Sequence, residues 1–269
     1  MGHRLLLFLA CLLWSGCWLP YEACASPKEI QPVAPRRKAG QPISYRLIYA
    51  AGVPCHVVYV DLRCTRLRLQ ILRAGDLGAR FLSFQSFVRQ SHALAAINGT
   101  FFDVRSGAII CNLVRDGRLL ESGGAGHTFT LSRDGKVGWL NTAGRAGGRI
   151  SWRNTQLAIS AGPTLVRHHR IVLCPEAEGF SDPGLFREAA RSGLATTRSG
   201  RLLLVSVHKP IRLGRFAAAM LALGVWDAIN LDGGTSSGLY VRGSYICKPG
   251  RQLTNVLVIN QRPRATRLK

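Results

Sequence analysis

Glycines and hydroxyl side chains follow a carboxylate at the end of one predicted strand, in the segment 228–240. The apolar run passes Asn230 and Leu231 and ends at Asp232, after which the sequence reads Gly-Gly-Thr-Ser-Ser-Gly. Glycines let backbone N–H groups approach a ligand closely, and hydroxyls donate hydrogen bonds to phosphate or sugar oxygens. The segment therefore predicts a site for an anion or a sugar, with an ordinary turn as the alternative interpretation.

A second predicted strand end repeats this pattern. Ala96-Ile97 leads to Asn98, and a glycine, a threonine, two phenylalanines and Asp103 follow. Because Ala-Ile-Asn occurs in both places, we expect the two strand ends to converge on one site. Taken singly, Asn98 is more simply a turn amide and Asp103 a hairpin or cap residue. Asp232, Asp103 and Asn98 are also the hard oxygen ligands that calcium or magnesium prefers, although no ligand spacing requires a metal.

The elements that must position these residues are mostly strands. Hairpin signals at 116–117 and 134–135, both Asp-Gly, join short apolar runs. Segment 81–92 predicts a helix with Ser83 as a possible N-cap, and segment 215–223 predicts another. The pattern indicates an α+β fold in a single domain dominated by antiparallel or mixed β-sheet, with few helices.

Two further regions carry polar residues. His127 follows a run rich in glycine, so it is either a ligand-facing residue or a surface or capping histidine, and the second interpretation is favoured. Segment 175–191 predicts a loop with a helical turn, in which Glu176, Glu178 and Asp182 are expected to be solvated.

The N-terminal residues predict that the chain is exported. Residues 1–25 contain a basic start, an apolar run and the cleavage pattern Ala23-Cys24-Ala25, which is typical of a secretory signal peptide. A lipoprotein signal at Cys17 is the less favoured alternative. We expect a flexible linker over 26–42, a domain over 43–260 and a basic tail over 261–269, with a periplasmic or secreted location and no transmembrane segment in the mature chain.

The net charge of the chain indicates which kinds of binding partner to expect. The 36 Lys and Arg residues against 14 Asp and Glu give a net charge of +22, which favours phosphate-bearing glycans or glycolipids and other anionic envelope polymers. The chain shows no nucleic-acid-binding motif, so no nucleic-acid partner is expected.

After removal of the signal peptide an odd number of cysteines remains, which allows at most two disulfides. The remaining cysteines are Cys55, Cys64, Cys111, Cys174 and Cys247.

Five motifs occur in one order and together resemble the phosphodiester glycosidase family. They are Ala96–Phe102 (AINGTFF), Ser160–Leu165 (SAGPTL), Arg191–Ala195 (RSGLA), Asn230–Ser237 (NLDGGTSS) and Arg251–Asn255 (RQLTN). The resemblance covers about residues 43–260. It implies an exported hydrolase that cleaves a sugar from a sugar-1-phosphodiester and leaves a phosphomonoester.

Such a cleavage requires stabilisation of an oxocarbenium-like centre and of a departing phosphate. We predict Asp232 as general base or nucleophile, Asn98 as the group that orients a sugar or phosphate oxygen, and Asp103 as a second carboxylate. The separation of the two carboxylates would decide between retaining and inverting chemistry. Arg191 is the candidate for bidentate phosphate binding. Further donors to the substrate are predicted at Gly233, Gly234, Thr235, Ser236 and Thr196.

The chain also departs from the family pattern. Ser206-Val207-His208 stands where relatives tend to have Asp-Gly, and the helix before the Asp-Gly-Gly motif lacks the acidic residue that they often carry. A non-catalytic phosphoglycan-binding module with the same fold is therefore the alternative function. Asp232 discriminates between the two, because only an enzyme has turnover to lose when this carboxylate is removed.

Overall fold

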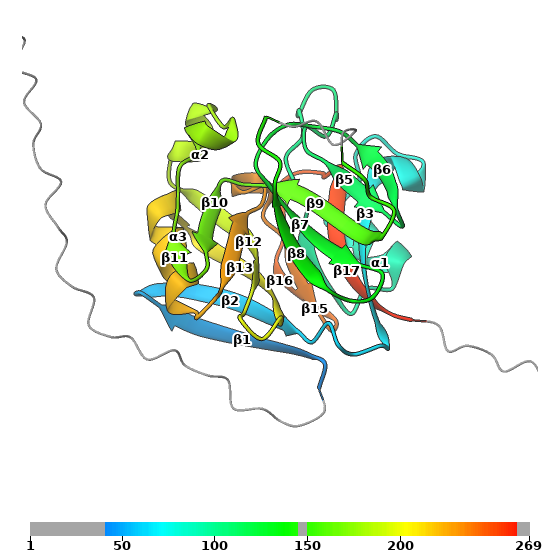
Figure 1. Cartoon of the computed structure of the whole chain (residues 1–269), viewed down its shortest axis with the longest axis horizontal. Helices are drawn as coiled ribbons and strands as arrows, with labels where there is room; N and C mark the ends of the chain where they lie inside the picture. Colours follow the sequence, from blue (N-terminus) through cyan, green and yellow to red (C-terminus); the bar gives the residue numbers. More distant parts are fainter. Residues whose placement is uncertain (1–40, 145–149, 263–269) are drawn as a thin grey trace, which may run out of the picture. The chain divides into compact units, whose positions relative to one another are not determined.

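The computed structural model describes residues 41–144 and 150–262, which form three antiparallel β-sheets with helices on the outside (Figure 1). The α+β class dominated by antiparallel sheet is thereby confirmed. The predicted signal peptide, nearly all of the predicted linker, and the basic tail after residue 262 lie outside the described residues. No helix in the described part of the chain is long and apolar enough to cross a membrane.

Sheet A is the largest and carries the strand that leads to Asp232. Its order is β1 (Ile43–Ala50), β2 (Val53–Val60), β13 (Leu202–Ile211), β12 (Ala189–Thr196), β14 (Asp227–Asn230), β10 (Thr164–Arg167) and β11 (Arg170–Ile171). Every neighbouring pair is antiparallel. The interior strand β14 is short and buried along its whole length, so the residues that follow it begin from a rigid base.

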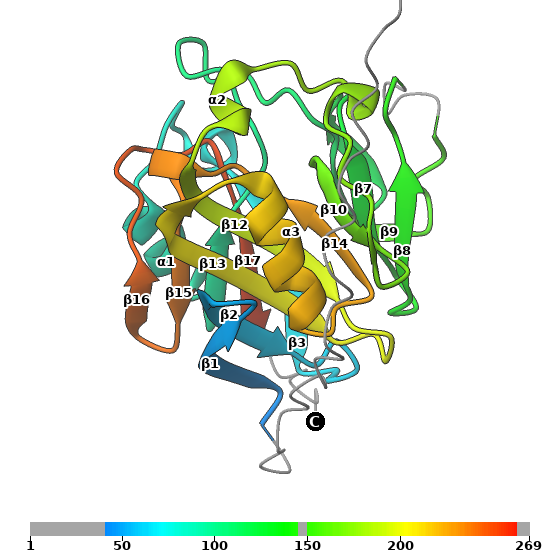
Figure 2. The ribbon, with the colours of Figure 1, turned by 90° about the vertical axis from the view of Figure 1, so that its left-hand side faces the viewer.

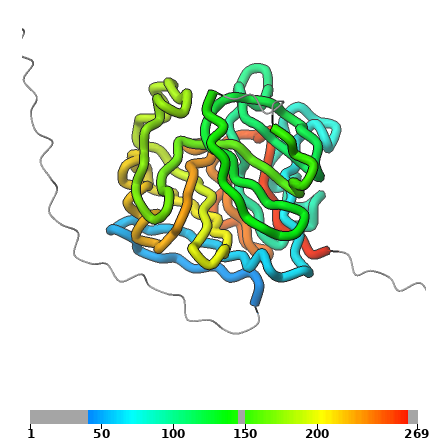
Figure 3. Tube along the Cα trace, in the orientation of Figure 1, coloured from blue at the N-terminus to red at the C-terminus, as the bar shows by residue number. Residues whose placement is uncertain are grey.

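Sheet B carries the strand that leads to Asn98. Its order is β16 (Ser244–Cys247), β15 (Leu239–Val241), β4 (Ala95–Asn98), β17 (Asn255–Gln261) and β3 (Leu67–Arg73). The last strand of the chain, β17, is inserted between β4 and β3, where the red end of the tube runs beside much earlier segments (Figure 3). The start of β17 is thereby brought next to the end of β4.

Sheet C contains both predicted Asp-Gly hairpins. Its order is β6 (Arg118–Glu121), β5 (Leu113–Arg115), β9 (Thr155–Ala161), β7 (His127–Ser132) and β8 (Val137–Asn141). The hairpin residues at 116–117 join β5 to β6, and those at 134–135 join β7 to β8. Gly117 and Gly135 both have positive φ, which is the conformation that favours glycine in such turns.

The main core lies where the inner faces of the three sheets meet. Aliphatic and aromatic side chains from each sheet are fully buried there, including Leu204, Ile97 and Phe129. Burial of each such side chain contributes about 1.5–3 kcal/mol to folding. This shared core holds the sheets at fixed positions relative to one another, and with them the strand ends.

Helices cover the outer faces of sheets A and B. The helices are α1 (Phe84–Ser91), α2 (Pro183–Phe186) and α3 (Leu213–Ala222). Helix α3 lies across β12 and β13 (Figure 2) and buries Phe216 and Met220 against sheet A. Helix α1 packs on sheet B, and the predicted N-cap is present because Ser83 Oγ accepts from the backbone N–H of Ser86 at 3.1 Å. The five cysteines expected in the mature chain are all free thiols.

Candidate functional site

The two predicted strand ends meet. The Asn98 side-chain amide donates to the backbone carbonyl of Asp232 at 2.7 Å, and the Asp232 backbone N–H donates to the Gly99 carbonyl at 3.3 Å. Asn98 Oδ1 accepts from the Gly238 N–H at 3.0 Å. Both ends of the buried Asn98 amide are thus used by backbone groups, so its place in the structure is that of a positioning residue that joins sheets A and B.

The Asp232 carboxyl lies at this junction and is partly exposed. Burial raises its pKa from 3.8 to about 6, while the Ser236 hydroxyl, the Gly233 N–H and the Arg251 guanidinium act in the opposite direction. The Gly233 N–H donates to Asp232 Oδ1 at 2.9 Å. A carboxyl that titrates near neutral pH can take or give a proton under physiological conditions.

A cation lies near this carboxyl, although the two groups form no ion pair within 4.0 Å among the described residues. Arg251 is exposed, its Nε donates to Thr235 Oγ1 at 2.5 Å, and its charge lowers the pKa of Asp232. The Gly250 N–H donates to the Thr235 carbonyl at 2.8 Å, which ties the glycine-rich loop to the segment before β17. Gly234 has φ of +58°, a backbone conformation that favours glycine. Of the predicted donors, Gly233 and Ser236 act on the Asp232 carboxyl directly, and Thr235 holds Arg251. Arg251 lies in the fifth motif, and no role at the site was predicted for it.

A close backbone approach holds the loop after β4. A Cβ at Gly99 would lie 1.7 Å from Asn255 Oδ1, a distance that no side chain can occupy. Asn255 Oδ1 accepts from the Thr100 N–H at 2.8 Å, and its Nδ2 donates to the Thr100 carbonyl at 3.1 Å. The asparagine pair Asn98 and Asn255 thus fixes both sides of the loop that faces Asp232.

A buried carboxylate lies on the sheet C side of the site. Glu178 accepts from the Thr164 N–H at 2.9 Å and from Thr164 Oγ1 at 3.0 Å, and its Oε2 lies 3.2 Å from His127 Nδ1. Its exposed fraction is 6%, so the expectation that it is solvated is wrong. It is buried because the loop folds back over β10, where the backbone N–H and hydroxyl of Thr164 satisfy the charge.

The cluster of His127, Thr164 and Glu178 is linked to the site by the turn between β9 and β10. The Asn230 amide donates to the Gly162 carbonyl at 3.1 Å. On the other side, the rings of Phe180 and Phe101 lie 5.5 Å apart. His127 is therefore a partly buried member of this network, whereas the favoured interpretation was a surface or capping histidine. The only hint in the sequence was the preceding glycine-rich run.

Two predicted site residues lie apart from Asp232. Asp103 is exposed, and its Oδ1 accepts from the backbone N–H groups of Arg105 and Ser106 and from the Ser106 hydroxyl, so it stabilises its own turn. Thr196 lies at the far end of β12 and accepts from the Trp139 indole at 3.1 Å. The carbonyl of Ser192, four residues earlier, bonds to the residue before Asp232, which places Thr196 roughly 13 Å away along the strand.

Arg191 is buried on the helix side of sheet A. Its Nε donates to the Ile211 carbonyl at 3.0 Å and its Nη2 to the Leu185 carbonyl at 3.1 Å, with a further contact to the Arg187 carbonyl. Burial lowers its pKa from the ordinary value for arginine. These contacts anchor the α2 segment to sheet A, and they give no support to the predicted phosphate role.

The three candidate metal ligands do not converge in this geometry. The Asn98 oxygen already accepts a backbone hydrogen bond, and Asp103 caps an exposed turn. Among the described residues no group of three or more His, Cys, Asp and Glu side chains could hold a metal ion.

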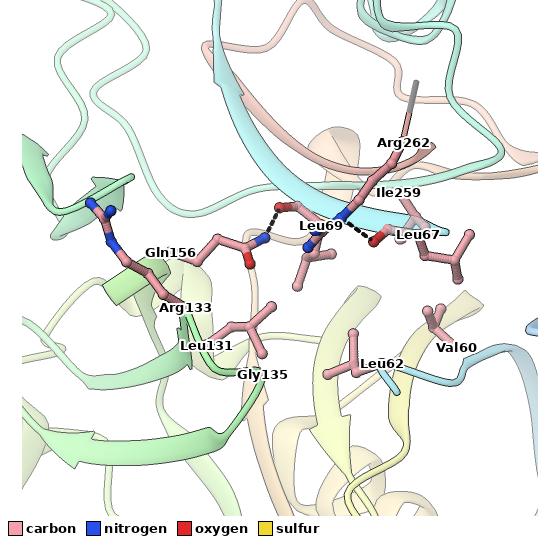
Figure 4. A pocket seen from close by; sticks show the side chains of 10 residues that line it. All are labelled: Val60, Leu62, Leu67, Leu69, Leu131, Arg133, Gly135, Gln156, Ile259 and Arg262. Atoms are coloured by element: carbon pink, nitrogen blue, oxygen red, sulfur yellow. Dashed lines mark hydrogen bonds between the residues drawn. The ribbon is translucent and has the colours of Figure 1, made fainter. Parts of the chain in front are cut away.

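A small cavity of about 50 Å³ lies at the opposite end of the core (Figure 4). Its walls are mostly aliphatic, and they include Val60 at the end of β2, Leu67 at the start of β3 and Ile259 near the end of β17. Since the start of β17 faces the site, this cavity is remote from Asp232.

Residues 91–260 match the family model described as phosphodiester glycosidase. The chain belongs to the phosphodiester glycosidase family. The match spans every site residue described above, from Asn98 to Asn255. Within this family the junction of Asn98, Asp232 and Arg251 is the candidate active site.

Relatives agree with this assignment. The chain is 27% identical over 194 residues to the bovine (Bos taurus) N-acetylglucosamine-1-phosphodiester alpha-N-acetylglucosaminidase, a match that covers 65% of this chain and 36% of that protein. The human (Homo sapiens) enzyme of the same name is 26% identical over 194 residues, with 65% and 37% covered. The chain thus spans little more than a third of the length of these curated relatives.

A solved structure shows the same fold. The zebrafish N-acetylglucosamine-1-phosphodiester alpha-N-acetylglucosaminidase catalytic domain, auto-inhibited by its pro-peptide, matches with a TM-score of 0.64 and 21% identity. The match covers 82% of each chain. At this identity the likeness supports the fold alone.

Proposed function

We propose that this chain hydrolyses sugar-1-phosphodiesters, releasing the sugar and leaving a phosphomonoester, on a cell-envelope or extracellular glycan. The observation that carries the proposal is the Asp232 carboxyl, whose pKa burial raises to about 6 next to a glycine-rich loop and near Arg251. Membership of the phosphodiester glycosidase family supports the reaction class. Export and an envelope substrate are supported by the predicted signal peptide and the net charge of +22.

The reaction divides between two charged groups. At neutral pH most of the Asp232 carboxyl is ionised, so it either takes a proton from the attacking water or attacks the anomeric carbon itself. Arg251 neutralises the charge that develops on the departing phosphate. Because phosphate is a good leaving group, no strong general acid is needed, and one ionised carboxylate suffices for the first bond to break. The anomeric configuration of the released sugar, read by NMR, distinguishes the base from the nucleophile.

The surrounding network keeps this carboxyl in place and partly desolvated. Asn98 and Asn255 hold the loop after β4, and Ser236 lies within reach of the carboxylate. Glu178 and His127 hold the turn between β9 and β10, which in turn bonds to Asn230. Rigid support of this kind lets a catalytic carboxylate retain a raised pKa without moving towards solvent.

The test is release of free sugar from a panel of sugar-1-phosphodiesters by the purified chain. We expect turnover with the native chain, at least a 10³-fold loss with Asp232→Asn, and about a 10²-fold loss with Arg251→Gln. Arg63→Gln, which removes an exposed arginine paired with Asp61 at the far end of β2, is the matched charge control and should leave turnover unchanged.

The pH profile assigns the role of the carboxyl. If Asp232 is base or nucleophile, kcat/KM rises as the pH rises through about 6, because only the ionised form reacts. A fall through the same pH would instead make it a general acid. Retained binding of phosphoglycans with no turnover across the panel would refute the hydrolase and favour the non-catalytic binding module.

A further inference from the structure

A second pocket, of about 310 Å³, lies outside the site described above. One wall is the hairpin 99–112, which is closed by a bridge between Phe102 and Ile109. The opposite wall is the end of β3 with the turn that follows it, including Arg73, Ala79 and Arg80. Glu121 and Thr254 also line the pocket.

This pocket and the active site lie at the same end of the strands of sheet B. Asn255 pairs with Arg73, and its neighbour Val256 pairs with Asn98. Arg73 is therefore two strands from Asn98, or roughly 10 Å at about 4.8 Å per strand. The hairpin 99–112 connects the two places, because it begins at the residues that contact Asp232 and also lines the pocket.

The charges around the pocket do not cancel. Arg73 pairs with Glu121 at 2.7 Å and with Asp76 at 2.8 Å, and Arg115 pairs with Asp76 at 2.7 Å. These four groups are neutral in sum. Arg80 adds a positive charge that has no acidic partner among the described residues, since its guanidinium donates only to the backbone carbonyls of residues 105 and 106.

Unused hydrogen-bonding capacity points in the same direction. Arg73 Nε is buried, yet it has no hydrogen-bond partner among the described residues. A buried donor without a partner is unfavourable, so an acceptor that reached this atom from the pocket would be stabilised. Next to it, the Glu121 carboxylate is 31% exposed at its side chain and can accept further hydrogen bonds from hydroxyl groups.

We infer that this pocket binds a sugar unit that carries an anionic group. Arg80 and Arg73 supply the cationic donors that phosphate and carboxylate groups prefer, and Glu121 supplies an acceptor for sugar hydroxyls. Ile109 and Ala79 supply an apolar surface for the ring. The pocket volume of about 310 Å³ suits a single sugar unit. The choice of a sugar rests on the proposed function, in which the pocket holds a further unit of an anionic glycan whose scissile bond lies at Asp232.

The test is direct binding, measured by isothermal titration calorimetry on the full chain, with glucose, glucose 6-phosphate and glucuronate as probes. We expect at least one anionic sugar to bind about tenfold more tightly than glucose. Tighter binding of glucose 6-phosphate identifies phosphate as the natural anion, and tighter binding of glucuronate identifies a carboxylate. Backbone NMR shifts at Ile109 and Thr254 should report the binding and place it in this pocket.

Two variants test the location by independent means. Arg80→Gln removes the unpaired charge and should abolish the preference for the anionic sugar, while Ala79→Phe should block the pocket with a ring. Arg63→Gln removes the same charge at the other end of β3 and should leave the preference intact. Equal affinity for all three probes, or a preference that survives both Arg80→Gln and Ala79→Phe, would overturn the inference. Since this assay needs no turnover, a chain that binds but does not hydrolyse refutes the proposed function alone.

Discussion

The raised pKa of Asp232 predicts that removing this carboxylate stabilises the protein. A carboxyl with a pKa of about 6 in the folded state and 3.8 unfolded loses 2.303RT × (6 − 3.8), or about 3 kcal/mol, of folding free energy once the pH is above both values. The contribution is fully favourable below the unfolded pKa and is lost as the pH rises through the folded one. Asp232→Asn cannot ionise, so the variant should be more stable than the native chain by about 3 kcal/mol at pH 8 and equal to it near pH 3.5.

Urea unfolding followed by tryptophan fluorescence, carried out at several pH values, measures this difference. Asp103→Asn is the matched control, because hydrogen bonds from Ser106 hold the pKa of that exposed carboxyl below its usual value. Its effect should be small and opposite in sign, appearing as a loss of stability above the unfolded pKa that vanishes at low pH. An Asp232→Asn variant that is less stable than the native chain at pH 8, or a difference that does not change with pH, would refute the reasoning about burial.

Three further perturbations test the supporting structure. Gly99→Ala places a Cβ where Asn255 Oδ1 now lies, so we expect a loss of at least 2 kcal/mol in unfolding free energy together with lost turnover; a fully active and stable variant would contradict the close approach. Arg191→Leu leaves three backbone carbonyls without their donor, which should cost about 3 kcal/mol, whereas weaker phosphate binding with unchanged stability would restore the phosphate role predicted for it. Chelation by EDTA should leave sugar release unchanged, and activity restored by added calcium or magnesium would instead demonstrate a metal.

Local patterns in the sequence were sufficient for the elements themselves. The Asp-Gly pairs mark the two hairpins of sheet C, Ser83 caps the helix that follows it, and the runs that lead to Asn98 and Asp232 form strands β4 and β14. Strand β14 ends at Asn230, two residues before Asp232. These features depend on residues within a few positions of each other, through turn geometry, capping and alternation. The order of the five motifs was also sufficient to identify the family, because that order can be read without knowing any distance between residues in the fold.

The partners of Asp232 could not be predicted in this way. Arg251 lies near Asp232 because the segment before β17 is tied to the loop of Thr235. Asp103 does not join it, because hydrogen bonds within its own turn hold that carboxylate. The position of Arg251 does not follow from spacing along the chain, because it depends on which strands become neighbours in the sheets. The local role of Asp103 is the hairpin or cap interpretation that the sequence also allowed.

Burial was decided by the tertiary structure as well. In the sequence Glu178 is one acid among several in a loop, yet it alone of that group is buried, against Thr164 and His127. Arg191 lies in a strand motif that suggested phosphate binding, but helix α2 packs over it and its Nε and Nη2 donate to backbone carbonyls. The sequence alone thus determined the strands, the turns and the carboxylate at a strand end. The sheet order decided which charges meet, since contacts between residues far apart in the chain arise only when the whole core is packed.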